Sequence, residues 1–250
     1  MTMITAITNV CVFDGDRVIG DQNVIIDGTR ILAVGSALPT GATVINADGG
    51  TLLPGLIDSH VHTDVNGLHD ALLFGVTTEL EMQGHWTFKQ RREIAERDDV
   101  ADLRSSGMGV TPPGGHPSQY MKSSNNLLMK LFFHFPFVST PDEAVKFVDK
   151  QIANGADYIK VFIEDGTTIG FPGLRATSIK TLIAAVNEAH RLGKMAIAHV
   201  TTVEGGEKAI SAGVDGLAHL FFDRQPTPGL IAAIASMSLD ASLENRTRLI

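Results

Sequence analysis

Two histidines separated by one residue, His60 and His62, are the first residues along the chain whose types and spacing point to chemistry. They close an apolar segment that is typical of a β-strand, and positions i and i+2 of a strand point to the same side. Two imidazoles would therefore reach one point, and neutral imidazole is a good ligand for zinc and similar ions. Such a pair is equally compatible with two core or rim histidines, so its interpretation depends on the rest of the chain.

Two further histidines, His199 and His219, close later apolar segments. One buried histidine is easily satisfied by backbone partners and then carries no function. Four histidines, all placed at or near the ends of expected strands, are harder to explain in this way. In a (β/α)8 barrel the carboxyl ends of the strands converge on one site, so these side chains would meet although they are far apart in the sequence.

Lys160 lies in the otherwise apolar strand expected at 158–163, where an unpaired ammonium group would be costly. The structural interpretation is an ion pair with Asp64, Glu81 or Glu164. The functional interpretation is a lysine with an altered charge beside the histidines. The sequence leaves both open.

The expected elements must position these residues. Residues 6–52 have the pattern of short strands joined by turns, with strands at 7–13, 23–26 and 30–34. From Leu56 short apolar segments alternate with helical stretches, which is typical of βα units that feed a parallel sheet. Six strands are expected, at 56–61, 76–82, 102–110, 158–163, 195–200 and 214–220. The clearest helices begin at Thr140 and span 178–192, 203–212 and 226–236.

Six strands with helical crossovers fit either an open doubly wound sheet or most of a (β/α)8 barrel. No Gly-x-Gly-x-x-Gly follows the first of these strands, which argues against dinucleotide binding, and the histidines favour the barrel. We therefore predict an α/β fold: an incomplete (β/α)8 TIM-type barrel with a small N-terminal β-sandwich module. The expected divisions are 1–54 for the module, 55–236 for the barrel and 237–250 for an atypical tail.

Composition excludes several classes of protein. The 250 residues are 44% hydrophobic and 19% charged, the balance of a packed soluble domain. A formal net charge of −8 disfavours nucleic-acid and anionic-membrane partners, and segment 127–138 is too short to span a bilayer. Cys11 is the single cysteine, so a cytoplasmic location is the default. Residues 1–5 resemble the leader of a β-galactosidase expression fusion and are left out of the fold prediction.

A longer pattern resembles a known family. Residues 53–62 read Leu-Pro-Gly-Leu-Ile-Asp-Ser-His-Val-His, and they are followed by Gly75-Val76-Thr77-Thr78, the strand-four lysine and the histidines of strands five and six. Over residues 6–236 the chain resembles the amidohydrolase superfamily, in particular its imidazolonepropionase-like and prolidase-like metallohydrolases. The resemblance implies a hydrolase that acts on the carbon-nitrogen bond of an amide, non-peptide or dipeptide-like, or on an ester of a small molecule.

The resemblance also implies roles for the site residues. His60 and His62 would bind one divalent metal, His199 and His219 a second, and an N6-carboxylated Lys160 would bridge both ions, expected to be two Zn²⁺. A carbamate is an anion stabilised by two cations, which would remove the cost of burying an ammonium group. A metal-bound hydroxide would attack the substrate while one metal polarises its carbonyl.

Segment 111–116, Thr-Pro-Pro-Gly-Gly-His, resembles the Gly-Gly-His loop of this subgroup. His116 would then contact the substrate or stabilise a developing oxyanion, while a plain Gly/Pro-rich loop is the alternative. Segment 127–138 could wall a hydrophobic pocket or simply pack in the core.

The chain departs from the family towards its end. Members have eight strands, and an Asp after the eighth binds the first metal and moves protons, whereas neither Asp223 nor Asp240 lies where that strand would place it. The hypothesis is a truncation or frameshift near residue 237. An incomplete barrel would expose two sheet edges and favour homo-oligomers. The alternative function is a non-catalytic remnant, and a phosphate-binding barrel is disfavoured because Glu204 and Glu207 follow strand five.

Overall fold

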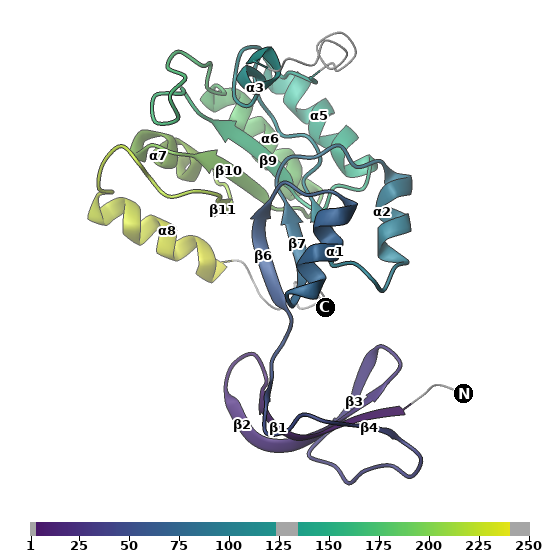
Figure 1. Cartoon of the computed structure of the whole chain (residues 1–250). Helices are drawn as coiled ribbons and strands as arrows, with labels where there is room; N and C mark the ends of the chain where they lie inside the picture. Colours follow the sequence, from purple (N-terminus) through teal and green to yellow (C-terminus); the bar gives the residue numbers. More distant parts are fainter. Residues whose placement is uncertain (1–3, 124–134, 241–250) are drawn as a thin grey trace. The chain divides into compact units, whose positions relative to one another are not determined.

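A computed structural model describes residues 4–123 and 135–240 (Figure 1). The chain divides into two compact units, residues 1–56 and 57–250.

The first unit is a five-stranded sheet in the order β3-β2-β1-β4, with β5 also paired to β1. Its strands are β1 (Ile4–Phe13), β2 (Val18–Asp27), β3 (Arg30–Val34), β4 (Thr43–Asn46) and β5 (Thr51–Leu52). The first three strands are antiparallel neighbours, whereas β4 and β5 run parallel to β1. Val10, Val12 and Val24 form its small core.

Two expectations for this unit were wrong. Ile4 and Thr5 belong to β1, where they face Asp27 and Ile26, so these two residues should not have been left out of the fold. Strand β4 was not expected because all four of its residues are exposed, and a strand without a buried face has no alternation of apolar and polar residues.

The second unit contains the six expected strands, and the predicted fold class is confirmed. They are β6 (Leu56–Val61), β7 (Val76–Glu81), β8 (Asp102–Ser105), β9 (Ile159–Ile163), β10 (Ala196–Val200) and β11 (Gly216–Leu217). Two three-stranded sheets, β6-β7-β8 and β9-β10-β11, are joined by a parallel bridge between Val110 and Val161. The six strands thus follow chain order, and within the described residues β6 and β11 do not pair to close the barrel.

Two strands, β8 and β11, are shorter than expected by more than one residue. The strand predicted at 102–110 ends at Ser105, because Gly107 adopts a left-handed φ of 63° and the chain turns before Val110 rejoins the sheet. The strand predicted at 214–220 is limited to two residues, so His219 lies just beyond β11 rather than within it.

The described helices are α1 (Val65–Leu73), α2 (Phe88–Ala95), α3 (Ser118–Ser123), α5 (Pro141–Ala153), α6 (Ile179–Arg191), α7 (Val203–Ser211) and α8 (Pro228–Asp240). Five of them, α1, α2, α5, α6 and α7, begin directly after an N-capping residue. Thr140 accepts a hydrogen bond from the Glu143 amide at the start of α5, and Ser178 caps α6 in the same way. Helix α8 continues past residue 236, the expected end of that helix. No helix in the described segments is long and apolar enough to cross a membrane.

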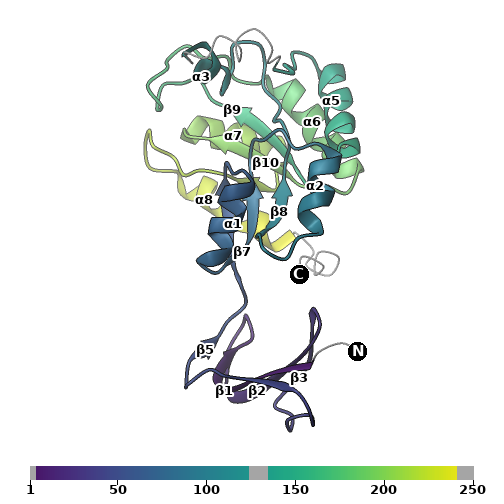
Figure 2. The same cartoon turned by 45° about the vertical axis from the view of Figure 1, so that its right-hand side comes forward.

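The core of the second unit lies between β9, β10 and the helices α5 and α6, which lie side by side in both views (Figures 1 and 2). All five residues of β9 are buried. Phe135 and Val138 pack in this core, as the structural interpretation of segment 127–138 predicts, and residues 127–134 lie outside the described residues. A strand with both faces covered holds its side chains in place, which makes β9 the rigid base of the site described next.

We expect Ile159→Ala to lower the free energy of unfolding by about 2–5 kcal/mol, because it opens a cavity under a side chain that is 0% exposed. The measurement is urea unfolding followed by circular dichroism. Ile231→Ala is the control, since Ile231 is 54% exposed and its truncation should change stability by less than about 0.5 kcal/mol. Equal effects of the two substitutions would contradict the assigned core.

Candidate metal centre

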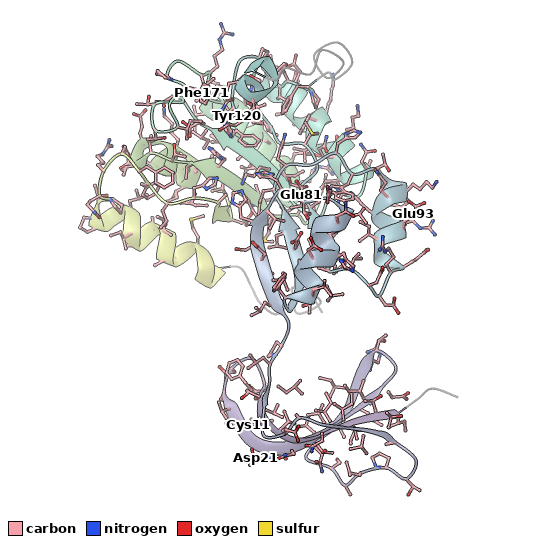
Figure 3. All side chains as sticks on the ribbon, in the orientation of Figure 1. Cys11, Asp21, Glu81, Glu93, Tyr120 and Phe171 are labelled. Atoms are coloured by element: carbon pink, nitrogen blue, oxygen red, sulfur yellow. The ribbon has the colours of Figure 1, made fainter. Side chains whose placement is uncertain are left out.

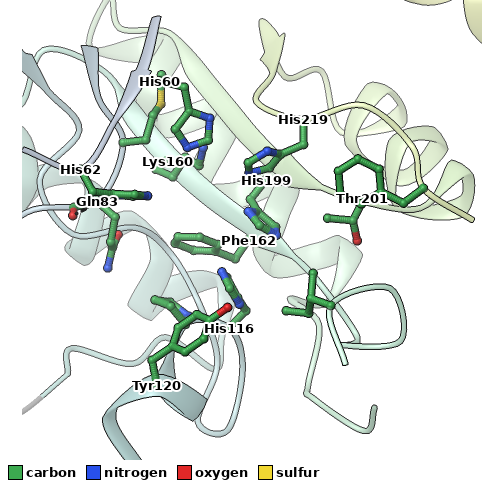
Figure 4. A pocket seen from close by; sticks show the side chains of 14 residues that line it. His60, His62, Gln83, His116, Tyr120, Lys160, Phe162, His199, Thr201 and His219 are labelled. Atoms are coloured by element: carbon green, nitrogen blue, oxygen red, sulfur yellow. Dashed lines mark hydrogen bonds between the residues drawn. The ribbon is translucent and has the colours of Figure 1, made fainter. Parts of the chain in front are cut away.

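A cavity of about 480 Å³ is lined by residues from the ends of the strands and the loops that follow them (Figure 4). The six residues that the sequence nominates all line it: His60, His62, His116, Lys160, His199 and His219. Asp223 does not line it, because its Oδ1 accepts a hydrogen bond from the Val203 amide at the start of α7. The side chain of Asp240 lies outside the described residues.

Four imidazole rings converge in this cavity. The centroids of His60 and His62 are 5.6 Å apart, and the ring of His219 lies 4.6 Å from His60 and 4.6 Å from His199. The strands supply this arrangement, because His60 lies near the end of β6, His199 lies near the end of β10 and His219 follows β11. The structure therefore brings the four strand-end histidines together, as the ring distances show.

His60 and His62 each have one ring nitrogen engaged. Nδ1 of His60 lies 3.1 Å from the Ala218 carbonyl oxygen, and Nδ1 of His62 lies 3.4 Å from the Gln83 carbonyl oxygen. A carbonyl oxygen only accepts, so both Nδ1 atoms carry the proton and both Nε2 atoms keep a lone pair. This is the arrangement of histidine ligands whose second nitrogen is held by a backbone partner.

Burial favours the neutral form of four rings in this cavity, those of His60, His116, His199 and His219. Loss of hydration lowers the pKa of His219 to about 3 and the pKa of His116 to about 4. The same cause lowers the pKa of His60 and of His199 below the usual histidine value. Neutral imidazole is the form that binds metal ions.

Lys160 lies at the base of the cavity and is 1% exposed. Its Nζ has no hydrogen-bond partner among the described residues, and burial lowers the pKa of this amine to about 7. The expected ion pairs are absent from the described structure, because each carboxylate is engaged elsewhere. Asp64 caps α1, and Glu81 accepts from the Ser105 hydroxyl at 2.6 Å. The interpretation of Lys160 as half of an ion pair is wrong.

Glu164 is the third carboxylate that was expected to pair with Lys160, and it contacts His199 instead, with 3.2 Å between Oε2 and Nε2. Burial alone would raise the pKa of Glu164, but hydrogen bonds from His199, Thr201 and the Gly166 amide outweigh it and hold this pKa at about 2. Glu164 is therefore a buried anion. The sequence signal was a charged residue directly after an apolar strand, which was read only as a partner of Lys160.

His116 lies in the same cavity. Its ring stacks on His199, with centroids 4.4 Å apart, and its Nδ1 lies 2.7 Å from Nε2 of Gln119 on α3. An amide NH₂ only donates, so the proton of His116 is on Nε2, which can act as a donor. Gln119 was missed by the sequence analysis, since nothing in its local pattern distinguishes it from a surface glutamine.

The described residues contain no group of three or more His, Cys, Asp or Glu side chains already placed to hold one ion. The four histidine rings supply no negative charge, and the nearby carboxylates of Glu81 and Glu164 are engaged with other partners. The remaining polar group is the amine of Lys160, which lines the same cavity and has no hydrogen-bond partner among the described residues. The donor set fits a metal centre if that amine is converted to an anion.

The chain matches the amidohydrolase family over residues 51–237. It is 42% identical over 76 residues to a dihydroorotase of Streptomyces coelicolor, which is 29% of this chain and 18% of that protein. It is 42% identical over 64 residues to an imidazolonepropionase of an Arthrobacter species, which is 24% of this chain and 16% of that protein.

Solved structures share the fold. A crystal structure of a prolidase complexed with N-methylphosphonate-L-proline superposes with a TM-score of 0.78 at 21% identity, covering 94% of this chain and 64% of that chain. This chain thus spans about two thirds of the length of that solved relative. The match over most of the barrel shows that the chain belongs to the amidohydrolase family.

Proposed function

We propose that the protein is a metal-dependent hydrolase that cleaves the carbon-nitrogen bond of an amide, or an ester, in a small molecule. The observation that carries the proposal is the Nζ of Lys160, which is buried without a hydrogen-bond partner among the described residues in a cavity that four histidines also line. An unpaired buried cation is costly, whereas a lysine that becomes a metal-binding anion is stabilised by the ions it binds.

His60 and His62 would hold one divalent ion, His199 and His219 a second, and Lys160 would contribute to both. Zinc suits imidazole ligands, and two Zn²⁺ ions are the proposed occupants. When bound, such ions lower the pKa of water and polarise a carbonyl group. Backbone contacts that already hold one ring nitrogen of His60 and of His62 support these roles.

The bridging group would form from carbon dioxide. The neutral amine of Lys160 attacks the carbon of CO₂, one N–H proton is released, and a carbamate results whose single negative charge is shared by two oxygens. The burial of Nζ favours this reaction, because it disfavours the protonated amine that cannot attack. The product would supply the negative charge that the four rings lack.

The family match does not favour the alternative of a non-catalytic remnant. We also propose a cytoplasmic location, since Cys11 is the single cysteine of the 250 residues. Self-association is proposed because Ile57 on the edge strand β6 is 60% exposed and Leu220 after β11 is 81% exposed. The division at 54/55 and the separate tail at 237–250 remain predictions.

The metal assignment predicts that zinc loading depends on carbon dioxide and on the named ligands. Metal-free protein should take up about two Zn²⁺ per chain in bicarbonate buffer and less in CO₂-depleted buffer, as measured by plasma mass spectrometry. Lys160→Met should abolish the dependence on bicarbonate, and His60→Ala should remove about one ion.

The matched control for this experiment is His190→Ala, because His190 on α6 pairs with Asp215 and does not line the cavity. Its zinc content should equal that of the wild type. If His60→Ala also retained the full zinc content, the ligand assignment would be wrong.

His116 is proposed to contact the substrate rather than the metal. Its Nε2–H could stabilise negative charge that develops on the carbonyl oxygen. We expect His116→Ala to lower kcat by about 10²–10³ while zinc content stays unchanged. His69→Ala, on α1 outside the cavity, is the control, and an unchanged kcat in the His116 variant would contradict the role.

An apolar wall supports a substrate with an apolar part. Phe162 and Ile169 line the cavity together with Tyr120, whose ring lies 5.7 Å from that of Phe171 (Figure 3). These side chains come from β9, the loop after it and α3. Aromatic and aliphatic walls bind apolar groups by excluding water from both surfaces.

Tyr120→Ala should therefore raise KM for p-nitrophenyl hexanoate by about tenfold and leave KM for p-nitrophenyl acetate nearly unchanged. The two esters share one leaving group, so steady-state kinetics isolate the apolar acyl chain. Phe88→Ala, an exposed aromatic side chain on α2, is the control. Equal changes for both esters would argue against the apolar wall.

A further inference from the structure

Glu164 directly follows β9 and is 2% exposed, yet both of its carboxylate oxygens are engaged. Oε2 accepts from the Thr201 hydroxyl at 2.5 Å and lies 3.2 Å from Nε2 of His199. Oε1 accepts from the Gly166 amide at 2.7 Å. A buried charge is costly unless it is fully hydrogen-bonded, so this carboxylate is held by several elements at once.

The contact determines which nitrogen of His199 is protonated. A carboxylate only accepts, so Nε2 of His199 carries the proton and Nδ1 keeps the lone pair. This is the reverse of His60 and His62, whose Nδ1 atoms are the protonated ones. His199 would thus meet a metal through Nδ1, and the other two rings through Nε2.

The same carboxylate is tied to the loop that walls the cavity. Gly166 has a φ of 84°, and a Cβ at this position would lie 1.8 Å from the Phe171 carbonyl oxygen. The loop after β9 therefore requires glycine at this position to keep its conformation. Thr201, which donates to Glu164, also contacts the hydroxyl of Thr168. Thr168 immediately precedes Ile169 in the cavity wall.

We propose that Glu164 is a positioning residue that fixes the protonation and the orientation of the His199 ring and joins this ring to the loop carrying Ile169. It touches neither substrate nor metal and acts through His199. The inference rests on the proposed metal centre.

Replacing the Glu164 carboxylate by a neutral group of the same shape should weaken its hold on the His199 ring. An amide in place of the carboxylate weakens the hydrogen bond to Nε2–H, and its NH₂ group can favour the opposite tautomer of His199. We expect Glu164→Gln to weaken binding of one of the two zinc ions by 10–100-fold and to leave the other unchanged. Glu164→Asp keeps the charge and should restore part of the affinity.

Zinc affinity is measured by competition with a chromophoric chelator, and the ligand geometry by the visible absorption of the Co²⁺-loaded protein. Glu164→Gln should alter the Co²⁺ spectrum. The control is Glu188→Gln, because Glu188 is also buried but pairs with Arg191 on α6. The Glu188 variant should match the wild type in both measurements.

A second measurement needs no variant. Long-range ¹H–¹⁵N spectra of histidine side chains in the metal-free protein report which ring nitrogen is protonated. His199 should show the Nε2–H form, while His60 and His62 should show the Nδ1–H form.

Wild-type affinity for both ions and an unchanged Co²⁺ spectrum in Glu164→Gln would overturn the proposal, as would an Nδ1–H form of His199 in the wild type. These outcomes would leave the proposed hydrolase intact. A wild-type chain that binds no zinc at any bicarbonate concentration would overturn the proposed function and this inference with it.

Discussion

The burial of Lys160 is the constraint on which the rest of the site depends. It lies on β9, a strand whose five residues are all buried, so its amine can neither reach water nor avoid the histidines around it. Each nearby carboxylate is used elsewhere: Glu81 accepts from Ser105, and Glu164 accepts from Thr201. An apolar strand that carries an amine without a partner is unfavourable for folding alone. Residues that are unfavourable for folding in this way are typical of functional sites.

The histidines follow from the same burial. Loss of hydration favours the neutral form of His60, His199 and His219, and neutral rings can lie 4.6 Å apart without the repulsion that imidazolium ions would have. Each ring then needs one fixed partner to define which nitrogen is free. Backbone carbonyls serve His60 and His62, whereas His199 uses a carboxylate. The cavity is therefore organised by the partners behind the rings as much as by the rings themselves.

The fold separates stability from chemistry. Helices α5 and α6 cover β9 and β10 and bury the core, while the strand ends and the loops after them carry the polar residues. The apolar wall comes from Phe162 of β9, from the loop after this strand and from α3, so only the parts on the loop and on α3 lie outside the core strand. This division is consistent with a family whose members act on different substrates on one barrel.

The sequence by itself determined where the six strands lie along the chain, because apolar periodicity and helix caps such as Thr140 and Ser178 are local signals. It also identified the four histidines, Lys160 and His116, since histidines at strand ends are visible without coordinates. It could not determine the ends of β8 and β11, which depend on a single glycine conformation and on pairing across the sheet. Only the tertiary structure decided that Lys160 is unpaired and that Glu164 belongs to His199. The pairing of buried charges depends on side-chain distances between segments far apart in the chain, and spacing along a sequence carries no such distances.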